Sequence, residues 1–292
     1  MQAFIPLTSV RNPLVQNIRE LASAKGRRRQ QAFICDGEHM VLEALRACPQ
    51  AVRAVLVEET ARAKHAVWLA EYSNSGNLSI QFYSVPQHIM AAISQVPSSQ
   101  GIAAVMSMSL PSLVNTEVAG YTDDAPLWYG ELSGGAGLGN RVVLMENLQD
   151  PGNVGGILRT VDAAGFNGAV LTTGCADPFA AKTLRASMGS VFRVPMVCAE
   201  GDAGITTARA IQVLQTGGYT MVAADLDGEP FYSRVTLPGR VCLMVGNEGE
   251  GLSPEALSAA TLRFRLPMRG GAESLNVAVA AAVMMYDIVN RG

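Results

Sequence analysis

The alternation of apolar and polar residues along the chain predicts two successive α/β segments. In the first segment, apolar residues at helical spacing alternate with short apolar runs, a pattern typical of helices separated by strands. Helices are expected over residues 12–24, 38–47, 62–72 and 86–93, and strands over residues 33–35, 52–57, 80–85 and 101–106. We therefore expect a small α/β domain over residues 1–108.

The second segment, residues 140–292, has longer and more continuous apolar runs. Strands are expected at 142–145, 169–172, 194–197, 220–224 and 241–245, and helices at 153–164, 179–188, 205–216, 254–260 and 274–289. Strands that are apolar throughout, separated by helices, are typical of a parallel sheet buried on both faces. We expect a mostly parallel sheet covered by helices on both sides.

Between the two domains, residues 109–139 contain prolines, polar residues and a glycine-rich run, which predicts a linker or an insertion. The spacing of Gly135, Gly137 and Gly139 is similar to a nucleotide-binding loop. Such a loop should follow a strand and open a helix, whereas these glycines precede a strand. The pattern therefore favours a flexible linker and argues against a nucleotide-dependent oxidoreductase.

Composition limits the class of protein. Nearly half of the residues are apolar and 16% are charged, which predicts a soluble protein with a substantial core. No apolar run approaches the ~18–20 residues that span a bilayer, and the amino-terminal sequence does not resemble a secretory signal. The five cysteines are scattered and form no CxxC pair, and all three histidines lie in the first half of the chain. We expect no membrane segment, no disulfide framework and no metal site, and a cytoplasmic location.

The charge is unevenly distributed. The chain has a net charge of −3, yet residues 1–108 carry ten basic against seven acidic residues. Lys25, Arg27, Arg28 and Arg29 form a basic cluster near the amino terminus. A local basic patch is what nucleic-acid phosphates meet, although a short basic run by itself is equally typical of a solvated helix end.

Three motifs in the second half carry the candidate chemistry. The first spans residues 146–160 and includes Asp-Pro-Gly-Asn and Arg159; the second is the glycine-acid loop of residues 246–253. The third comprises Leu266-Pro267-Met268 and residues 273–277, Glu-Ser-Leu-Asn-Val. In order and spacing these blocks resemble the motifs of the SpoU (TrmH) family of RNA ribose methyltransferases, which use S-adenosylmethionine (AdoMet).

The amino-terminal domain carries a second resemblance. Residues 9–13, Ser-Val-Arg-Asn-Pro, the basic cluster and Asp36-Gly37-Glu38 are similar to the RNA-binding domain that precedes many SpoU enzymes. That domain has an L30e/L7Ae-like α/β fold and usually carries an acidic residue before the glycine, which Asp36 supplies here.

The resemblance implies a fold and a function. It implies a SPOUT-type sheet with a deep trefoil knot, built from the segments that hold Gly246 and Ser274, and a homodimer. The implied activity is AdoMet-dependent 2′-O-methylation of a ribose in structured RNA, with ribosomal RNA favoured over tRNA. Two alternatives remain: a tRNA ribose methyltransferase, and a ribosome-assembly factor that binds RNA without catalysis.

Ribose methylation requires that a hydroxyl be aligned with the methyl donor and lose its proton. The resemblance implies five catalytic residues, namely Asn153, Arg159, Glu248, Ser274 and Asn276. A guanidinium stays protonated up to about pH 12, so we favour Arg159 as a group that orients RNA and stabilises a developing alkoxide, ahead of base action. Glu248 is expected to orient Arg159 or Asn153. For Ser274 a simple helix cap is the alternative.

The resemblance also implies the binding residues. Backbone at Gly246, Leu266 and Leu275 is expected to hold AdoMet, and glycine lets the backbone approach a ligand closely. The expected lining residues of the cofactor site are Thr172, Asn247 and Met268. The RNA-binding set is expected to be the basic cluster together with Arg185, for which a structural helix terminus is the alternative.

Overall fold

The computed structural model of the chain describes residues 4–74, 80–96, 98–108, 138–198, 205–233, 237 and 239–290. These residues belong to two compact units. One lies within Met1–Thr116 and also includes Phe179–Phe192, and the other lies within Glu117–Pro178 and Arg193–Gly292. The predicted linker, residues 109–139, lies outside the described residues except for Leu138 and Gly139.

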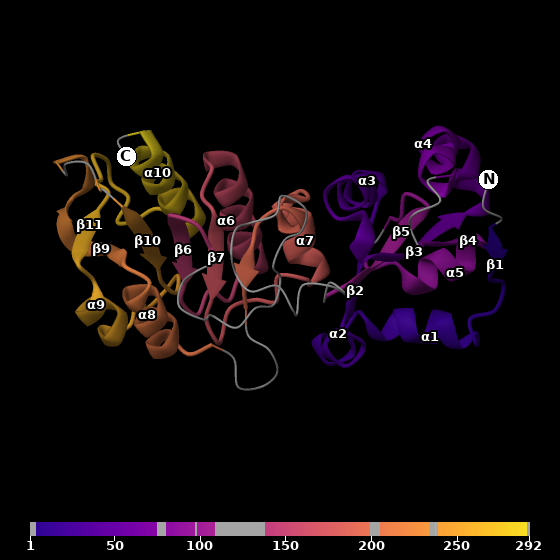
Figure 1. Cartoon of the computed structure of the whole chain (residues 1–292), viewed down its shortest axis with the longest axis horizontal. Helices are drawn as coiled ribbons and strands as arrows, with labels where there is room; N and C mark the ends of the chain where they lie inside the picture. The colour runs from indigo at the N-terminus through magenta and orange to yellow at the C-terminus, as the bar shows by residue number, and fades with distance from the viewer. Residues whose placement is uncertain are drawn as a thin grey trace. The chain divides into compact units, whose positions relative to one another are not determined.

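The first unit contains a mixed five-stranded sheet among its described residues, in the order β1-β4-β3-β5-β2. The strands are β1 (Ile5–Pro6), β2 (Ala32–Asp36), β3 (Val52–Glu58), β4 (Gln81–Val85) and β5 (Ile102–Ser107). β5 runs antiparallel to β2 and β3, whereas β3 and β4 are parallel. The helices are α1 (Pro13–Glu20), α2 (Ala24–Gln30), α3 (Glu38–Ala47), α4 (Arg62–Asn74) and α5 (Gln87–Ile93). Figure 1 shows α1 and α5 on one face of this sheet and α3 on the other.

The predicted single helix over residues 12–24 is wrong, because α1 ends at Glu20 and α2 begins at Ala24. Ser23 caps α2 by accepting a hydrogen bond from the Gly26 amide at 3.0 Å. A Cβ atom at position 26 would collide with the carbonyl group of Glu20. Only glycine therefore lets α2 begin so close to the end of α1.

The first unit also takes in residues 179–192, which include α7 (Ala181–Ser187). Phe33 on β2 lies 4.7 Å from Phe179 and 6.4 Å from Phe192, measured between ring centroids. The three rings are buried, so the two ends of the segment share one aromatic contact. The predicted second domain, residues 140–292, includes this segment.

Among its described residues, the second unit contains a six-stranded parallel sheet in the order β11-β9-β10-β6-β7-β8. Its strands are β6 (Arg141–Met145), β7 (Gly168–Leu171), β8 (Met196–Val197), β9 (Tyr219–Pro230), β10 (Arg240–Val245) and β11 (Leu262–Arg265). Its helices are α6 (Pro151–Ala164), α8 (Thr207–Thr216), α9 (Pro254–Ala259) and α10 (Val277–Asn290). Figure 1 shows α6 and α10 on one face and α8 and α9 on the other, which confirms the predicted architecture.

The edge of this sheet departs from the prediction. β9 continues six residues beyond the expected end, and β11 was not expected. β11 pairs with β9 through a register shift between Arg263 and Phe264. A Cβ at Gly228 would overlap the backbone of these two residues, so glycine permits the close approach of the two strands.

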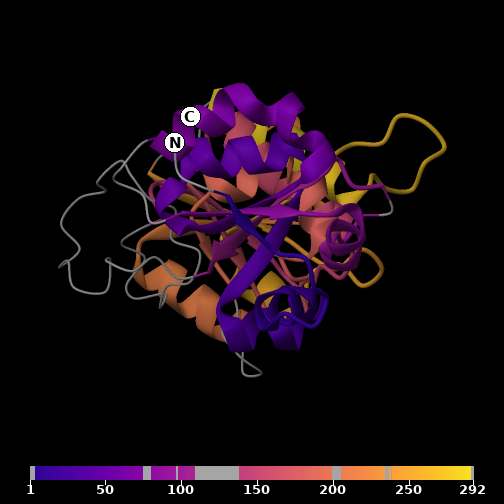
Figure 2. The ribbon, with the colours of Figure 1, turned by 90° about the vertical axis from the view of Figure 1, so that its right-hand side faces the viewer.

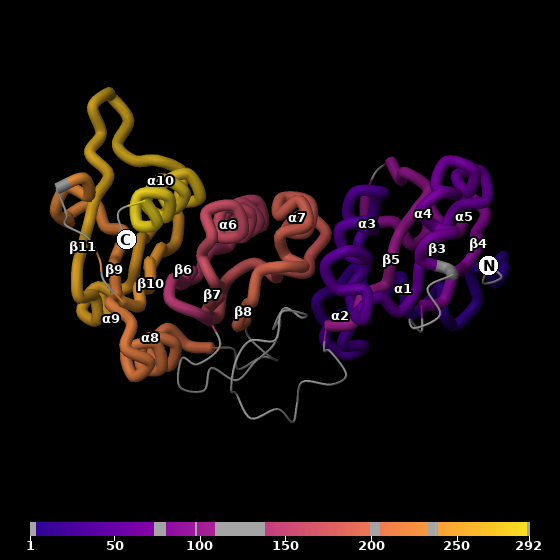
Figure 3. The backbone as a smooth tube through the Cα atoms, turned by 45° about the horizontal axis from the view of Figure 1, so that its top comes forward, coloured from indigo at the N-terminus to yellow at the C-terminus, as the bar shows by residue number. Residues whose placement is uncertain are grey.

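The last helix begins at Val277, three residues later than predicted. The side chain of Asn276 accepts hydrogen bonds from the amides of Ala278 and Val279, so Asn276 caps the helix and Ser274 does not. The segment between β11 and α10 projects from the fold, as Figures 2 and 3 show, and its residues 269–276 are exposed. The deep knot and the L30e/L7Ae likeness stay predictions.

Candidate functional site

A cavity of about 580 Å³ opens where β10 ends. Four stretches of the second unit supply most of its lining: residues 224–227 of β9, residues 245–252, residues 264–268 except Pro267, and residues 274–277. The volume is in the range of small-molecule sites, ~300–1,000 Å³. Ligands of open α/β sheets bind at the carboxyl ends of strands, and this cavity has that position.

The loop of residues 246–253, called the glycine loop below, folds back on itself beside the cavity. Asn247 and Gly251 form an isolated antiparallel bridge. A Cβ at Gly246 would overlap the backbone of Gly251 and Leu252, whereas one at Gly249 would meet only ordinary contacts. Position 246 thus requires glycine because there is no room for a Cβ. Position 251 favours glycine because its φ of 73° lies in the left-handed region.

The side chain of Asn247 fixes the first half of the glycine loop. Its Oδ1 atom accepts hydrogen bonds from the amides of Gly249 at 2.9 Å and Glu250 at 3.2 Å. Its Nδ2 atom donates to the carbonyl oxygen of Asn147 at 3.0 Å. The loop is therefore tied to the residues that follow β6.

A hydrogen-bonded chain joins the three sequence motifs. Asn276 Nδ2 donates to Asn153 Oδ1 at 2.9 Å, and Asn153 Nδ2 donates to Glu248 Oε1 at 2.8 Å. Because Asn276 Oδ1 already accepts two amides of α10, its other side-chain atom must be the donor. This sets the donor-to-acceptor direction of all these side-chain hydrogen bonds, the last of which ends on the Glu248 carboxylate. Of the two expected partners of Glu248, the structure shows Asn153.

α6 presents Asn153 and Arg159. Asp150 caps the helix by accepting from the Asn153 amide at 3.0 Å, and Pro151 takes the first helical position, where its missing N–H costs nothing. Arg159 is exposed six residues later, almost two turns along the helix, and no hydrogen bond or ion pair joins it to another described residue. Gly156, between them, lies against α10, where a Cβ would make an ordinary 3.5 Å contact with Ala278.

The cavity brings most of the predicted site residues together. Its lining includes the predicted catalytic and cofactor residues Gly246, Asn247, Glu248, Leu266, Met268, Ser274, Leu275 and Asn276. Asn153 is joined to them by hydrogen bonds, whereas Arg159 lies outside the lining. Thr172 is also outside it; its hydroxyl is buried and accepts a hydrogen bond from the Asn147 amide.

The predicted basic cluster does not act as one group. Lys25, Arg28 and Arg29 are exposed, and Arg29 pairs with Glu20. Arg27 is 4% exposed, and its guanidinium donates to the carbonyl groups of Leu21 and Ala22, which close the turn between α1 and α2. Arg27 therefore has a structural contact within the fold, and its direct contact with RNA stays a prediction.

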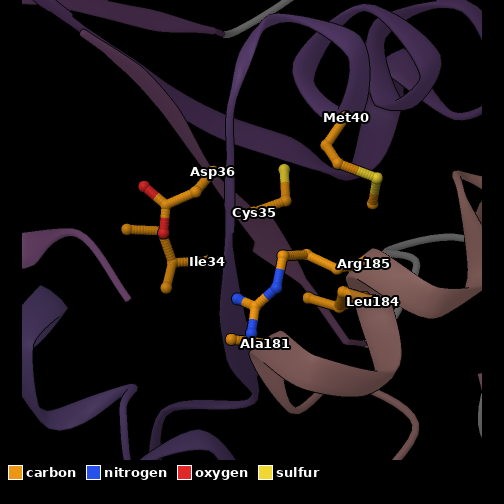
Figure 4. A pocket seen from close by; sticks show the side chains of 7 residues that line it. All are labelled: Ile34, Cys35, Asp36, Met40, Ala181, Leu184 and Arg185. Carbon is orange, nitrogen blue, oxygen red and sulfur yellow. The ribbon is translucent and has the colours of Figure 1, made fainter. Parts of the chain in front are cut away.

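Arg185 on α7 is exposed at the mouth of a small hollow beside β2. Figure 4 shows its side chain reaching toward the strand that carries Asp36. Burial raises the pKa of Asp36, and the Gln95 amide, the Ser94 hydroxyl and the Arg185 charge offset part of that rise. Asp36 Oδ1 has no hydrogen-bond partner among the described residues.

Two acidic residues outside the predicted set of site residues, Glu146 and Asp225, also contribute to the site. Glu146 follows β6 directly and is 6% exposed, and its carboxylate accepts three hydrogen bonds. Asp225 on β9 lines the cavity and pairs with Arg263 on β11. An acidic residue directly after a buried parallel strand was the available signal for Glu146, since such positions face the binding edge of the sheet.

Within the part of the chain that the structure describes, no group of three or more His, Cys, Asp or Glu side chains is arranged to hold a metal ion. None of the helices in this part of the chain is long and apolar enough to cross a membrane.

Comparison with known proteins adds independent information. Residues 140–286 match the SpoU rRNA methylase family, and residues 12–104 match the MRM3-like substrate binding domain. The 23S rRNA (guanosine(2553)-2′-O)-methyltransferase RlmP of Bacillus subtilis is 32% identical over 282 residues, which is 97% of this chain and 98% of that protein.

Solved structures are similar over the whole chain. The AdoMet-bound rRNA methyltransferase from Sinorhizobium meliloti has a TM-score of 0.76 and 26% identity, covering 98% of this chain and 97% of that one. A putative RNA methyltransferase of the TrmH family from Porphyromonas gingivalis has a TM-score of 0.74 and 27% identity, covering 97% of this chain and 100% of that one.

Proposed function

The chain belongs to the SpoU rRNA methylase family, and from this premise we propose that it transfers a methyl group from AdoMet to a ribose 2′-hydroxyl of ribosomal RNA. One observation carries the proposal: the three motifs, far apart in the sequence, meet around one cavity and are joined there by Glu248, Asn153 and Asn276. The name of the Bacillus relative, a 23S rRNA 2′-O-methyltransferase, supports rRNA as the substrate.

The cavity fits AdoMet by size and by lining. The missing side chain at Gly246 exposes the backbone, where a Cβ would collide with the next turn of the loop, and Leu266, Met268 and Leu275 add apolar surface. Such a mixture suits a nucleoside, whose base is flat and whose edges form hydrogen bonds. When bound, AdoMet supplies an electrophilic methyl group on its sulfonium. We assign the binding to backbone at Gly246, Leu266 and Leu275, with Asn247 and Met268 beside them and Thr172 acting through Asn147.

The catalytic assignment follows the exposure and the contacts of each group. Arg159 is exposed and has no partner among the described residues, so its guanidinium is available to an RNA phosphate and to the charge that develops on the ribose oxygen. Asn153 and Asn276 hold each other and Glu248 in place, and they give the site a fixed polar wall. Ser274, exposed beside the cavity and free of a capping role, is assigned to contact with substrate.

RNA binding is assigned to the first unit. Lys25, Arg28 and Arg29 lie exposed on or near α2, and the match to a substrate-binding domain covers this region. Arg185 is exposed on α7 and is kept in the set. These side chains supply positive charge for phosphates, which gives affinity without sequence preference.

Methyl transfer to total RNA tests the proposal. The purified protein is incubated with tritiated AdoMet and with RNA or ribosomal particles that lack its modification, and the label is mapped by 2′-O-methyl sequencing. Label at one ribose of rRNA is expected. Label in tRNA would show that tRNA, and not rRNA, is the substrate. AdoMet binding without label in any RNA or particle would favour the catalytically silent assembly factor.

Arg159→Ala tests the role of the arginine. We expect turnover to fall at least about 100-fold, the scale of losing one group that stabilises a developing negative charge, while AdoMet affinity stays within twofold. Arg209→Ala, an exposed arginine on α8, is the matched control and should keep full turnover. Near-normal turnover of the Arg159 variant would refute the assignment.

The free surface of α10 supports a homodimer. Val279 and Tyr286 are 49% and 47% exposed on a helix that is apolar except for Tyr286 itself, Asp287 and Asn290. A second copy that covers this surface would complete the burial that the helix composition predicts. Light scattering should give twice the 30.8 kDa of one chain, and a monomer mass at micromolar concentration would contradict the dimer. As a modifier of rRNA, the protein is expected to act in the cytoplasm.

A further inference from the structure

We propose that Glu146 is a positioning residue that holds the glycine loop in the conformation that binds AdoMet. Glu146 does not line the cavity, so it can act on a ligand only through the residues that it contacts. The inference rests on the proposed function, because it takes the cavity to be the AdoMet site.

The carboxylate of Glu146 is buried and its two oxygen atoms are both used. Oε1 accepts from the hydroxyl groups of Thr207 and Ser253, each at 2.7 Å, and Oε2 accepts from the Ser253 amide at 2.9 Å. A buried carboxylate is tolerated only where such donors replace water. Two of its three bonds go to the last residue of the glycine loop.

Ser253 is a junction between the loop and α9. Its hydroxyl group donates to Glu146 and accepts from the Ala256 amide at 3.2 Å, which makes it the N-cap of α9. The neighbour of Glu146 holds the other end of the loop, since the Asn147 carbonyl accepts from Asn247. Two consecutive residues after β6 therefore fix both ends of the loop.

The consequence for binding follows from the tight packing within the loop. Gly246 lies against the backbone of Gly251 and Leu252, and all three residues line the cavity. Leu252 is bonded to Ser253, so a shift of Ser253 moves the wall of the cavity. Without the carboxylate, the loop would sample other conformations and only a fraction of the molecules would be competent to bind, which raises the apparent Kd.

Glu146→Gln is the main test. The amide has one acceptor oxygen, which can serve either the two hydroxyl groups or the Ser253 amide but not both. We expect the Kd for AdoMet, measured by calorimetry, to rise about tenfold, with kcat at saturating AdoMet within twofold of wild type. Amide hydrogen exchange at residues 249–252 should accelerate in the same variant. Glu146→Leu, which removes all three acceptors, should weaken binding further.

Two controls separate positioning from a general loss of stability. Thr207→Val removes one hydroxyl donor and leaves both bonds to Ser253, so its Kd should change less than threefold. Tyr219→Phe removes a hydrogen bond from the Tyr219 hydroxyl group to the Gly139 carbonyl in the same unit. Neither Glu146 nor the glycine loop takes part in this bond, so the variant should lower Tm with an unchanged Kd.

The outcomes are distinct. A Kd for Glu146→Gln within twofold of wild type, or an equal rise in Tyr219→Phe, would overturn the role of Glu146 while leaving the proposed function intact. Failure of the wild-type protein to bind AdoMet would overturn the proposed function and this inference with it. If Glu146→Leu does not fold, Glu146→Gln against Thr207→Val still decides the matter.

Discussion

Alanine substitutions at three glycines of the glycine loop should distinguish the effect of steric overlap from the effect of an unfavourable backbone conformation. At Gly246 an added Cβ would lie at least about 1 Å closer to the backbone of Gly251 and Leu252 than ordinary contact allows. At Gly251 the space is open, but φ is 73°. At Gly249 neither restriction applies, because the nearest atom, Asn247 Oδ1, would be 3.6 Å away. Alanine at the three positions should therefore have graded effects.

The magnitudes follow from these geometries. Overpacking against a backbone that cannot rotate away costs about 1–3 kcal/mol, and the loop can relieve it only by moving into or away from the cavity. Gly246→Ala should therefore raise the Kd for AdoMet about 10- to 100-fold. Gly251→Ala should cost about 1–2 kcal/mol of stability, the price of a left-handed residue with a Cβ. Gly249→Ala should be neutral.

The assay is calorimetric titration of AdoMet into each variant, with thermal unfolding measured alongside. The expected order of Kd is Gly246→Ala above Gly251→Ala above Gly249→Ala, with the last within twofold of wild type. Equal affinities for Gly246→Ala and Gly249→Ala would refute the reasoning, because the two variants add the same atom to the same loop and differ only in what it meets.

Two further predictions concern the first unit. Arg27→Ala should destabilise the protein by about 1.5–3 kcal/mol, because the carbonyl groups of Leu21 and Ala22 lose the guanidinium as their donor; thermal unfolding measures this effect. The double variant Lys25→Ala, Arg28→Ala should keep its Tm and lose salt-dependent RNA affinity, with the salt slope falling by about 1 per phosphate contact; filter binding measures this effect. Because burial raises the pKa of Asp36, the folded protein holds this proton to a higher pH than the unfolded chain does. The free energy of unfolding should therefore fall as the pH rises from 3.8 through the folded pKa, and Asp36→Asn should remove that part of the slope in urea titrations at stepped pH.

The sheet of the second unit was predictable because its strands are buried on both faces. Such strands must be continuous apolar runs, and the runs ending at Met145 and Val245 had no other plausible role. β11 has only four residues, alternating between Leu or Phe and Arg, and it becomes a strand because β9 lies beside it. Pairing of this kind depends on tertiary position and leaves little trace in four residues.

The candidate site was predictable to the extent that its residues lie in the motifs. The contacts that organise it join positions about one hundred residues apart, such as Glu146 with Ser253 and Asn147 with Asn247. Local spacing carries no information about such pairs. The burial of Arg27 was missed for the same kind of reason, since three consecutive arginines are identical in sequence and differ only in which way each points from α2.

Glu248 contacts Asn153 and does not hold the side chain of Arg159 in place. The sequence motifs predict that Glu248 orients either Arg159 or Asn153. The hydrogen bonds that begin at the cap of α10 lead through Asn276 and Asn153 to Glu248. Glu248 is thus engaged by a neutral amide, and no ion pair joins Arg159 to another described residue. An unpaired guanidinium keeps its rotamer freedom until an anion arrives. We therefore expect an RNA phosphate to order Arg159. AdoMet binding should then leave this side chain mobile and RNA binding should immobilise it, a difference that NMR relaxation of the arginine Nε–Hε group would detect.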